Sequence, residues 1–167
     1  AKLELEKALA ECERMVMSDI EDKGDRAVIF EALKHAVVSG NALFFQDKEG
    51  ARMWALDRFV LRRDAMGNLI EIVICEDYDY DTLPEDVKAS LPDMHGLEKP
   101  GADIRECSVY THVYRKGTTF HQYQEVKGVV VEGSQASWPE ASMPYVPMRL
   151  LRVSGASYGE GYVSQYF

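Results

Sequence analysis

The spacing of apolar residues changes at residue 41, and this change limits the possible folds more than any other feature of the sequence. Before it, apolar side chains recur every three or four residues, which indicates two amphipathic helices. The first stripe consists of Leu5, Leu9, Cys12, Val16 and Ile20. The second consists of Phe30, Leu33 and Val37. Gly40 stands where the second helix needs a left-handed cap. The first helix is expected to end near Lys23 and Gly24, so the two helices should form a hairpin.

After residue 41 the chain consists of short β-branched and aromatic runs separated by turn residues, a pattern typical of strands. The runs before residue 76 are 42–46, 53–56, 58–63 and 69–75. The last two flank a turn in which Gly67 and Asn68 can take positive φ. Later strands are expected near 129–131, 138–139, 144–147 and 148–153. The fold class is therefore predicted to be α+β, with the N-terminal helical hairpin packed on antiparallel β-hairpins or a small sheet.

A third hairpin begins near Arg105 and is predicted to turn at Lys116 and Gly117. A two-residue loop there would pair Val113 with Phe120 and His112 with His121. The core side would carry Val109, Val113 and Phe120. The other face would carry Tyr110, His112, Tyr114, His121 and Tyr123. Because such rings join apolar bodies to polar tips, we interpret this second face as a candidate subunit interface or a contact with another segment.

The stretch from residue 76 to residue 104 separates these parts. It begins with a predicted acidic turn at 76–81, and a short helix follows, with Thr82 and Glu85 at capping-box spacing and Pro84 in the first turn. Residues 92–103 lack periodicity and are expected to form a mobile surface loop. The predicted parts are thus 1–75 (helical hairpin plus sheet), 76–104, and the β-rich segment 105–167.

Charge is unevenly distributed. The net charge is −9, and residues 76–106 alone carry ten acidic against three basic residues. A protein that grips phosphates needs clustered Lys and Arg, and this chain has no such cluster beyond short pairs such as Arg62 and Arg63, so tight DNA binding is disfavoured. No apolar run approaches the length of a membrane span, and the N-terminus lacks a signal-peptide pattern, so a cytoplasmic protein without a membrane segment is expected.

Two groups of residues suggest a metal site, and each lacks part of the required pattern. Asp77, Asp79 and Asp81 match the first positions of a calcium loop, but Thr82 and Lys88 stand where Gly and Glu are needed. A solvated acidic turn is the better interpretation. His112 and His121 could supply two zinc ligands, yet the pairing places no third ligand beside them. No metal site is predicted.

Catalytic and cofactor motifs are also incomplete. The glycine-rich stretch 154–161 lacks the Gly-Lys-Ser/Thr ending of a phosphate loop and is expected to be a flexible turn. Cys12, Cys75 and Cys107 match no zinc or redox motif and are interpreted as buried thiols. No catalytic residue and no cofactor is predicted, although a small stand-alone α+β enzyme or ligand- or metal-binding domain stays as the alternative.

Several short stretches of the sequence together form a recognisable pattern. They are Phe30–Lys34 with Val37–Asn41, Val60–Leu69, Leu83–Val87, Val109–Tyr114, Pro144–Pro147 and Ser157–Gly159. These stretches resemble the portal, or head-to-tail connector, proteins of short-tailed bacteriophages. They occur in one order across nearly the whole chain, which makes coincidence improbable.

The resemblance implies a non-enzymatic subunit of a homo-oligomeric ring, usually dodecameric, at one capsid vertex of the virion. Such a ring assembles in the host cytoplasm with scaffold and capsid proteins, docks the packaging terminase ATPase, and later binds the tail adaptor. Double-stranded DNA passes through it during packaging and ejection, and an acidic or neutral channel wall would avoid holding phosphates. Residues 1–75 resemble part of the wing, and 76–153 would lead toward stem and clip. The chain starts without Met and stops in an aromatic run, so we expect a piece of a longer protein whose stem helix follows.

Overall fold

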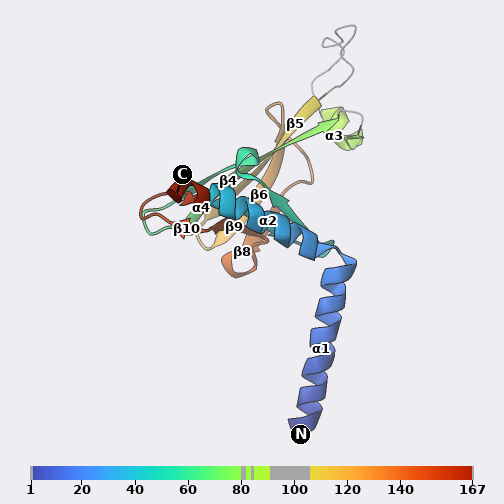
Figure 1. The fold of residues 1–167 in the computed structure, drawn as a ribbon. Helices are drawn as coiled ribbons and strands as arrows, with labels where there is room; N and C mark the ends of the chain where they lie inside the picture. The colour runs from blue at the N-terminus through green and yellow to red at the C-terminus, as the bar shows by residue number, and fades with distance from the viewer. Residues whose placement is uncertain (1, 80–81, 84, 91–105, 167) are drawn as a thin grey trace. The chain divides into compact units, whose positions relative to one another are not determined.

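The computed structural model describes residues 2–79, 82–83, 85–90 and 106–166, which divide into two compact units (Figure 1). Unit 1 comprises Ala1–Leu56, Pro144–Val153 and Tyr158–Phe167, and unit 2 comprises Asp57–Met143 and Ser154–Ser157. Helices come first and antiparallel sheets follow, which confirms the predicted α+β class. Among the described helices, none has the length and apolar character needed to span a membrane.

The sheet of unit 1 has β1 (Asn41–Gln46) at its centre, between β2 (Ala51–Trp54) and β9 (Tyr145–Arg149). Strand β1 is paired along both of its edges and is buried along most of its length. Pro147 has no backbone N–H to donate, which suits its place in the edge strand β9. The ring of Phe45 lies 4.7 Å from that of Tyr145 and 6.1 Å from that of Trp54, forming the aromatic part of this core.

Helix α2 (Asp25–Ser39) packs on β1 and β2 through Ala32 and Ala36. The predicted core stripe of Phe30, Leu33 and Val37 is wrong, because these three side chains are exposed. Small alanine side chains let the helix approach the sheet closely, whereas the spacing of apolar residues in the sequence pointed to the larger side chains as the contact. The predicted cap is confirmed, since Gly40 has φ 77° and donates its N–H to the Ala36 carbonyl at 2.9 Å.

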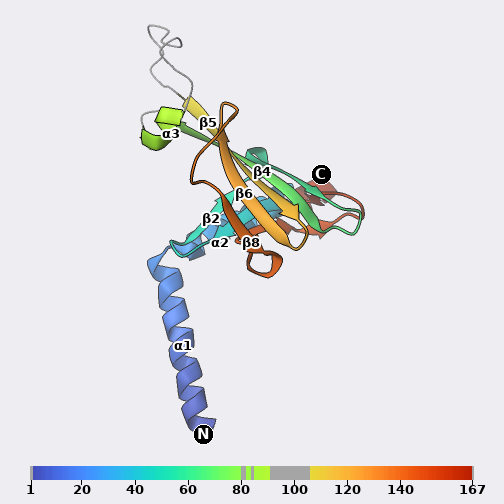
Figure 2. The same cartoon turned by 180° about the vertical axis from the view of Figure 1, so that it is seen from behind.

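Helix α1 (Lys2–Asp22) buries none of its residues. The predicted packing of α1 on α2 as a hairpin is therefore not observed, and Figures 1 and 2 show α1 leaving the start of α2 without running alongside it. The turn itself is where the sequence predicts it, at Gly24 with φ 71°. Periodicity reveals that a helix has an apolar face but not which surface that face covers.

The glycine-rich stretch contributes a fixed backbone junction within unit 1. The strands β10 (Leu151–Arg152) and β11 (Gly159–Glu160) pair, and α4 (Tyr162–Tyr166) follows. The buried amide of Asn41 donates to the Gly159 carbonyl at 2.8 Å and accepts from the Gly159 N–H at 2.7 Å. A Cβ on Gly161 would lie 2.2 Å from the Val38 carbonyl oxygen. The expected flexible turn is thus wrong for Gly159–Gly161, where glycine is needed for close backbone contact.

Unit 2 is built on one antiparallel sheet. Its strands, in order, are β3 (Phe59–Arg63), β4 (Leu69–Asp79), β5 (Glu106–Lys116), β6 (Thr119–Val126) and β7 (Val129–Val130). The strand β8 (Ala136–Pro139) also pairs with β6, and the short helices η1 (Leu56–Arg58) and η4 (Glu140–Ser142) flank the sheet strands in sequence. Strand β4 continues through residues 76–79, where an acidic turn was expected. The strand can continue here because the carboxylate of Asp77 accepts hydrogen bonds from Arg58 at 2.6 Å and from Ser108 at 2.9 Å.

The register of β5 and β6 differs from the predicted one by two residues. Lys116 pairs with Thr119, so the loop is Gly117 and Thr118 rather than Lys116 and Gly117. Gly117 has φ 65°, and a glycine at the first loop position is typical of a type II′ hairpin turn. His112 therefore lies opposite Tyr123, and the predicted pairing of His112 with His121 is wrong. A shift of two residues leaves every side chain on its predicted face.

The inner face of this sheet forms the core of unit 2. Val109, Val113 and Phe120 are buried there, as predicted. At one end, Leu83 and Val87 join them, and α3 (Glu85–Ser90), which carries Val87, confirms the predicted short helix. The Thr82 hydroxyl donates to the Asp79 carbonyl at 2.7 Å.

Some predictions concern residues that lie outside the described ones. These are Asp81, Pro84 and the loop 92–103. The wing, stem and clip division also stays a prediction. For the thiols, Cys107 is buried as expected, whereas Cys75 is half-buried and Cys12 is exposed.

Candidate functional site

The five predicted interface residues lie on one face of the larger sheet, which we call the aromatic face. It consists of Tyr110, His112, Tyr114, His121 and Tyr123. They alternate along β5 and β6 with buried residues, because successive side chains of a strand point to opposite faces. Tyr110 and Tyr114 are each 39% exposed, and the other three are half-buried. The aromatic face is therefore accessible within the described chain while its backbone belongs to a rigid sheet.

The rings of the aromatic face hold one another in place. His112 stacks on Tyr123 with 4.8 Å between ring centroids and 4° between ring planes. Tyr114 stacks on His121 at 5.6 Å and meets Tyr123 edge-on at 6.2 Å. Such contacts contribute about 0.5–1.5 kcal/mol per pair beyond the area that they bury. The face is thus ordered before any partner binds.

Ion pairs border the rings. Arg62 contacts Glu71 at 3.2 Å, Arg58 contacts Asp77 at 2.6 Å, and the Nε2 atom of His112 lies 3.9 Å from Glu125. The hydrogen bond from Arg58, followed by that from Ser108, lowers the pKa of Asp77. The same ion pair raises the pKa of Arg58. An aromatic centre with a charged rim is the usual composition of a protein interface.

Tyr110 has a second neighbour on this face, the thiol of Cys75 on β4. The two residues are paired across β4 and β5. A hydrogen bond with the side chain of Cys75 raises the pKa of Tyr110. The phenol therefore stays a neutral hydrogen-bonding group in ordinary buffers.

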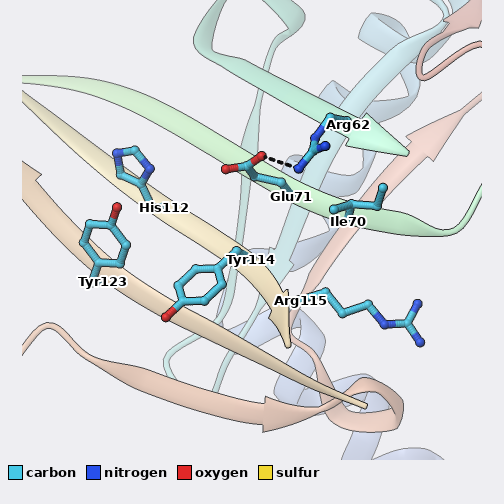
Figure 3. A pocket seen from close by; sticks show the side chains of 7 residues that line it. All are labelled: Arg62, Ile70, Glu71, His112, Tyr114, Arg115 and Tyr123. Atoms are coloured by element: carbon cyan, nitrogen blue, oxygen red, sulfur yellow. Dashed lines mark hydrogen bonds and ion pairs between the residues drawn. The ribbon is translucent and has the colours of Figure 1, made fainter. Parts of the chain in front are cut away.

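An open hollow of about 500 Å³ lies beside the rings (Figure 3). Its lining combines the rings of His112, Tyr114 and Tyr123 with the Arg62–Glu71 ion pair. Ring faces and a guanidinium suit an aromatic or aliphatic side chain of a partner better than they suit a reacting small molecule. No group of three or more His, Cys, Asp or Glu residues in the described ranges is placed to hold a metal ion.

Sequence reasoning missed the charged rim. Arg62 and Glu71 lie in the two strands of a hairpin that was predicted from its turn at residues 64–68, so their pairing could have been read from the hairpin itself. Glu125 could not be placed beside His112 in this way, because the predicted register of β5 and β6 was wrong.

Comparison with known proteins gives a family and several relatives. A family described as bacteriophage head to tail connecting protein matches residues 1–167. The chain is 36% identical to the portal protein of Enterobacteria phage T3 and 34% identical to that of Escherichia phage T7, over 97% of this chain and 31% of each relative. It is 32% identical to the portal protein of Pseudomonas phage phiKMV, over 98% of this chain and 32% of that relative. The chain thus spans about a third of the length of these relatives.

Proposed function

The chain belongs to the family of bacteriophage head to tail connecting proteins, and on this premise we propose that it is part of a ring subunit of a phage portal. The observation that carries the proposal is the family match over all 167 residues, together with relatives that are portal proteins. In this proposal the polypeptide acts by assembling at a capsid vertex and not by catalysis. The comparisons do not support the alternative of a stand-alone enzyme or ligand-binding domain.

The aromatic face is the proposed contact with a neighbouring subunit. A closed ring of identical subunits uses a heterologous contact, in which two different patches of one subunit meet their counterparts on its neighbours. Large aromatic side chains that are already ordered lose little side-chain entropy on binding. The stacked rings of His112 and Tyr123, with Tyr110 and Tyr114 exposed beside them, meet this requirement for one of the two patches.

The proposed ring would let double-stranded DNA pass without holding it. The net charge is −9, and three arginines beside the aromatic face, Arg58, Arg62 and Arg115, are each engaged by a carboxylate. Few phosphates could therefore be bound by this part of the protein. Partners would be the packaging terminase ATPase, scaffold and capsid proteins, and a tail adaptor. A dodecameric ring is the expected stoichiometry.

Mass photometry and electron microscopy of the full polypeptide that contains these residues test the proposal. We expect large rings from the unchanged protein and mostly single subunits from the Tyr110→Ala/His112→Ala variant, with nearly unchanged subunit folding by circular dichroism. The matched control is Met66→Ala, because Met66 is an apolar side chain of unit 2 that is 83% exposed and lies in the turn between β3 and β4. Rings that survive the double change would remove the aromatic face from the interface. Absence of rings from the unchanged protein would overturn the portal function itself.

A further inference from the structure

Unit 1 carries two helical stripes whose large apolar side chains are exposed in the described part of the chain. On α1, Leu5 and Leu9 are each 61% exposed, and on α2, Phe30 is also 61% exposed. Leu33 and Val37 continue the second stripe and are exposed as well. Scattered apolar residues on a surface are ordinary, but continuous apolar stripes on two adjacent helices mark an interaction site.

The two stripes have the same spacing. Leu5, Leu9, Cys12 and Val16 follow one another at intervals of four, three and four residues. On α2, Phe30, Leu33 and Val37 repeat the last two of these intervals, three and four residues. Helices whose apolar residues recur in this way pack lengthwise, with the side chains of each inserted between those of the other. The two stripes are therefore suited to each other.

Charge also distinguishes the two helices. Residues 2–22 of α1 carry seven acidic and three basic side chains. The stripe of α2 is bordered by two basic residues, Arg26 and Lys34, and the Nζ atom of Lys34 lies 4.7 Å from the centre of the Phe30 ring. The acidic Asp25 of α2 is buried on the opposite side, toward the sheet. An acidic helix beside a stripe with a basic border is the favourable arrangement.

A short hydrogen-bonded elbow joins the two helices. Gly24 donates to the Glu21 carbonyl at 3.2 Å, and Ala27 donates to the Gly24 carbonyl at 3.0 Å. Across the turn, Arg26 contacts Glu21 at 3.2 Å. These bonds hold the elbow. Ile20 at the end of α1 is half-buried beside Ala27 and Phe30, whereas Leu5, Leu9 and Val16 are exposed in the described chain.

We propose that the stripe of α1 in one copy packs against the stripe of α2 in the neighbouring copy. The inference rests on the proposed ring, because a head-to-tail ring needs two different complementary surfaces on each subunit. In addition to the aromatic face, one chain supplies a complementary pair of surfaces here, an acidic apolar helix and a basic-bordered apolar helix. Pairing of α1 with α1 would not serve, since an isologous contact joins two copies and does not extend around a ring.

The test uses disulfide formation between two tagged forms of the full polypeptide that are co-expressed, both with Cys75→Ser. The first form keeps Cys12, the thiol in the middle of the α1 stripe, and the second carries Cys12→Ser with Phe30→Cys, Leu33→Cys or Val37→Cys. The matched control is Glu31→Cys, an exposed position on another side of α2. Cys12 and the positions on α2 are exposed, and the half-buried Cys75 is replaced by a serine of similar size, so the variants should fold as the unchanged chain does.

We expect a covalent heterodimer from at least one stripe position, at roughly tenfold the yield of the control, since thiols whose Cα atoms are more than about 7 Å apart cannot be bridged. Equal yields from stripe and control positions, or disulfides only between two Cys12 residues, would overturn the inference. So would rings that form normally without any heterodimer, and that outcome would leave the portal function standing. Mass photometry of the same samples reports the ring independently, so a failure of the portal function is recognised separately.

Discussion

The aromatic face on β5 and β6 and the stripe on α1 both expose large apolar side chains, but they differ in what holds them. The rings of the face stack at 4.8 and 5.6 Å and lie on strands whose other side is buried core. The stripe of α1 lies on a helix that buries none of its residues. The first surface is ordered before binding, whereas a helix in a protein gains most of its stability from packing of its apolar face, and α1 buries none of its residues within the described chain.

The largest effect should come from removing the support beneath the aromatic face. Phe120 is 2% exposed on the inner side of β6, so Phe120→Ala should reduce the free energy of unfolding by about 3–5 kcal/mol. Urea unfolding followed by tryptophan fluorescence and circular dichroism measures the loss. Tyr110→Ala on the exposed side is the control and should cost much less. Equal losses at the two positions would mean that the aromatic face is itself part of a core.

A smaller effect should reveal how firmly the rings hold one another. A double-mutant cycle of His112→Ala and Tyr123→Ala should give a coupling free energy of about 1 kcal/mol, because stacked rings lose their contact when either one is removed. The same cycle with Tyr110→Ala and Tyr123→Ala is the control. That control pair would face each other in the register predicted from the sequence, so a larger coupling there would favour that register over the observed one.

The contrast between periodicity and register explains what the sequence could predict. Alternation placed all five rings on one face and Val113 and Phe120 on the other, because the strand period of two depends only on the order of the residues. Which residues lie opposite one another depends on the turn. From the sequence alone, Gly117 could be the second loop residue, after Lys116, or the first, before Thr118. The face of the candidate site was thus predictable, but its stacked pairs were not.

Tertiary contacts over long sequence distances were not readable from local patterns. The amide of Asn41 binds Gly159, which lies 118 residues further along the chain, and no sequence pattern near either residue predicts this contact. Likewise Ala32 and Ala36 are the contacts of α2 with the sheet, whereas the spacing of larger apolar residues pointed to the opposite side of the helix. In both cases the close approach of two backbones selected small residues, and this selection becomes visible only in the folded chain.

The charged rim of the aromatic face should make its stability depend on pH. Arg58, and then Ser108, lower the pKa of Asp77, so the ion pair contributes fully above about pH 4 and its contribution is lost as the pH falls through the lowered pKa. Asp77→Asn should remove this part of the acid dependence of the free energy of unfolding, by a small amount because the pair is exposed. Urea unfolding between pH 7 and pH 3 measures it. Glu13→Gln, which removes a carboxylate from α1, should leave the acid dependence as it is, and a matching change there would contradict the assignment to Asp77.

The smallest effect on folding is expected from a substitution on α1. It is the sharpest test of the difference between the ordered aromatic face and the unsupported stripe of α1. Leu9→Gln replaces an exposed leucine by a residue of similar helix propensity, so the free energy of unfolding of the single subunit should change by no more than about 0.5 kcal/mol. Yet the same change should reduce ring formation in mass photometry, because it removes an apolar contact from the proposed pairing of α1 with the neighbouring α2. A control at Glu13→Gln, on the same helix, should alter neither quantity. If Leu9→Gln instead destabilised the single subunit by more than about 1.5 kcal/mol, α1 would have to pack within its own chain, and the difference between an ordered face and an unsupported stripe would disappear.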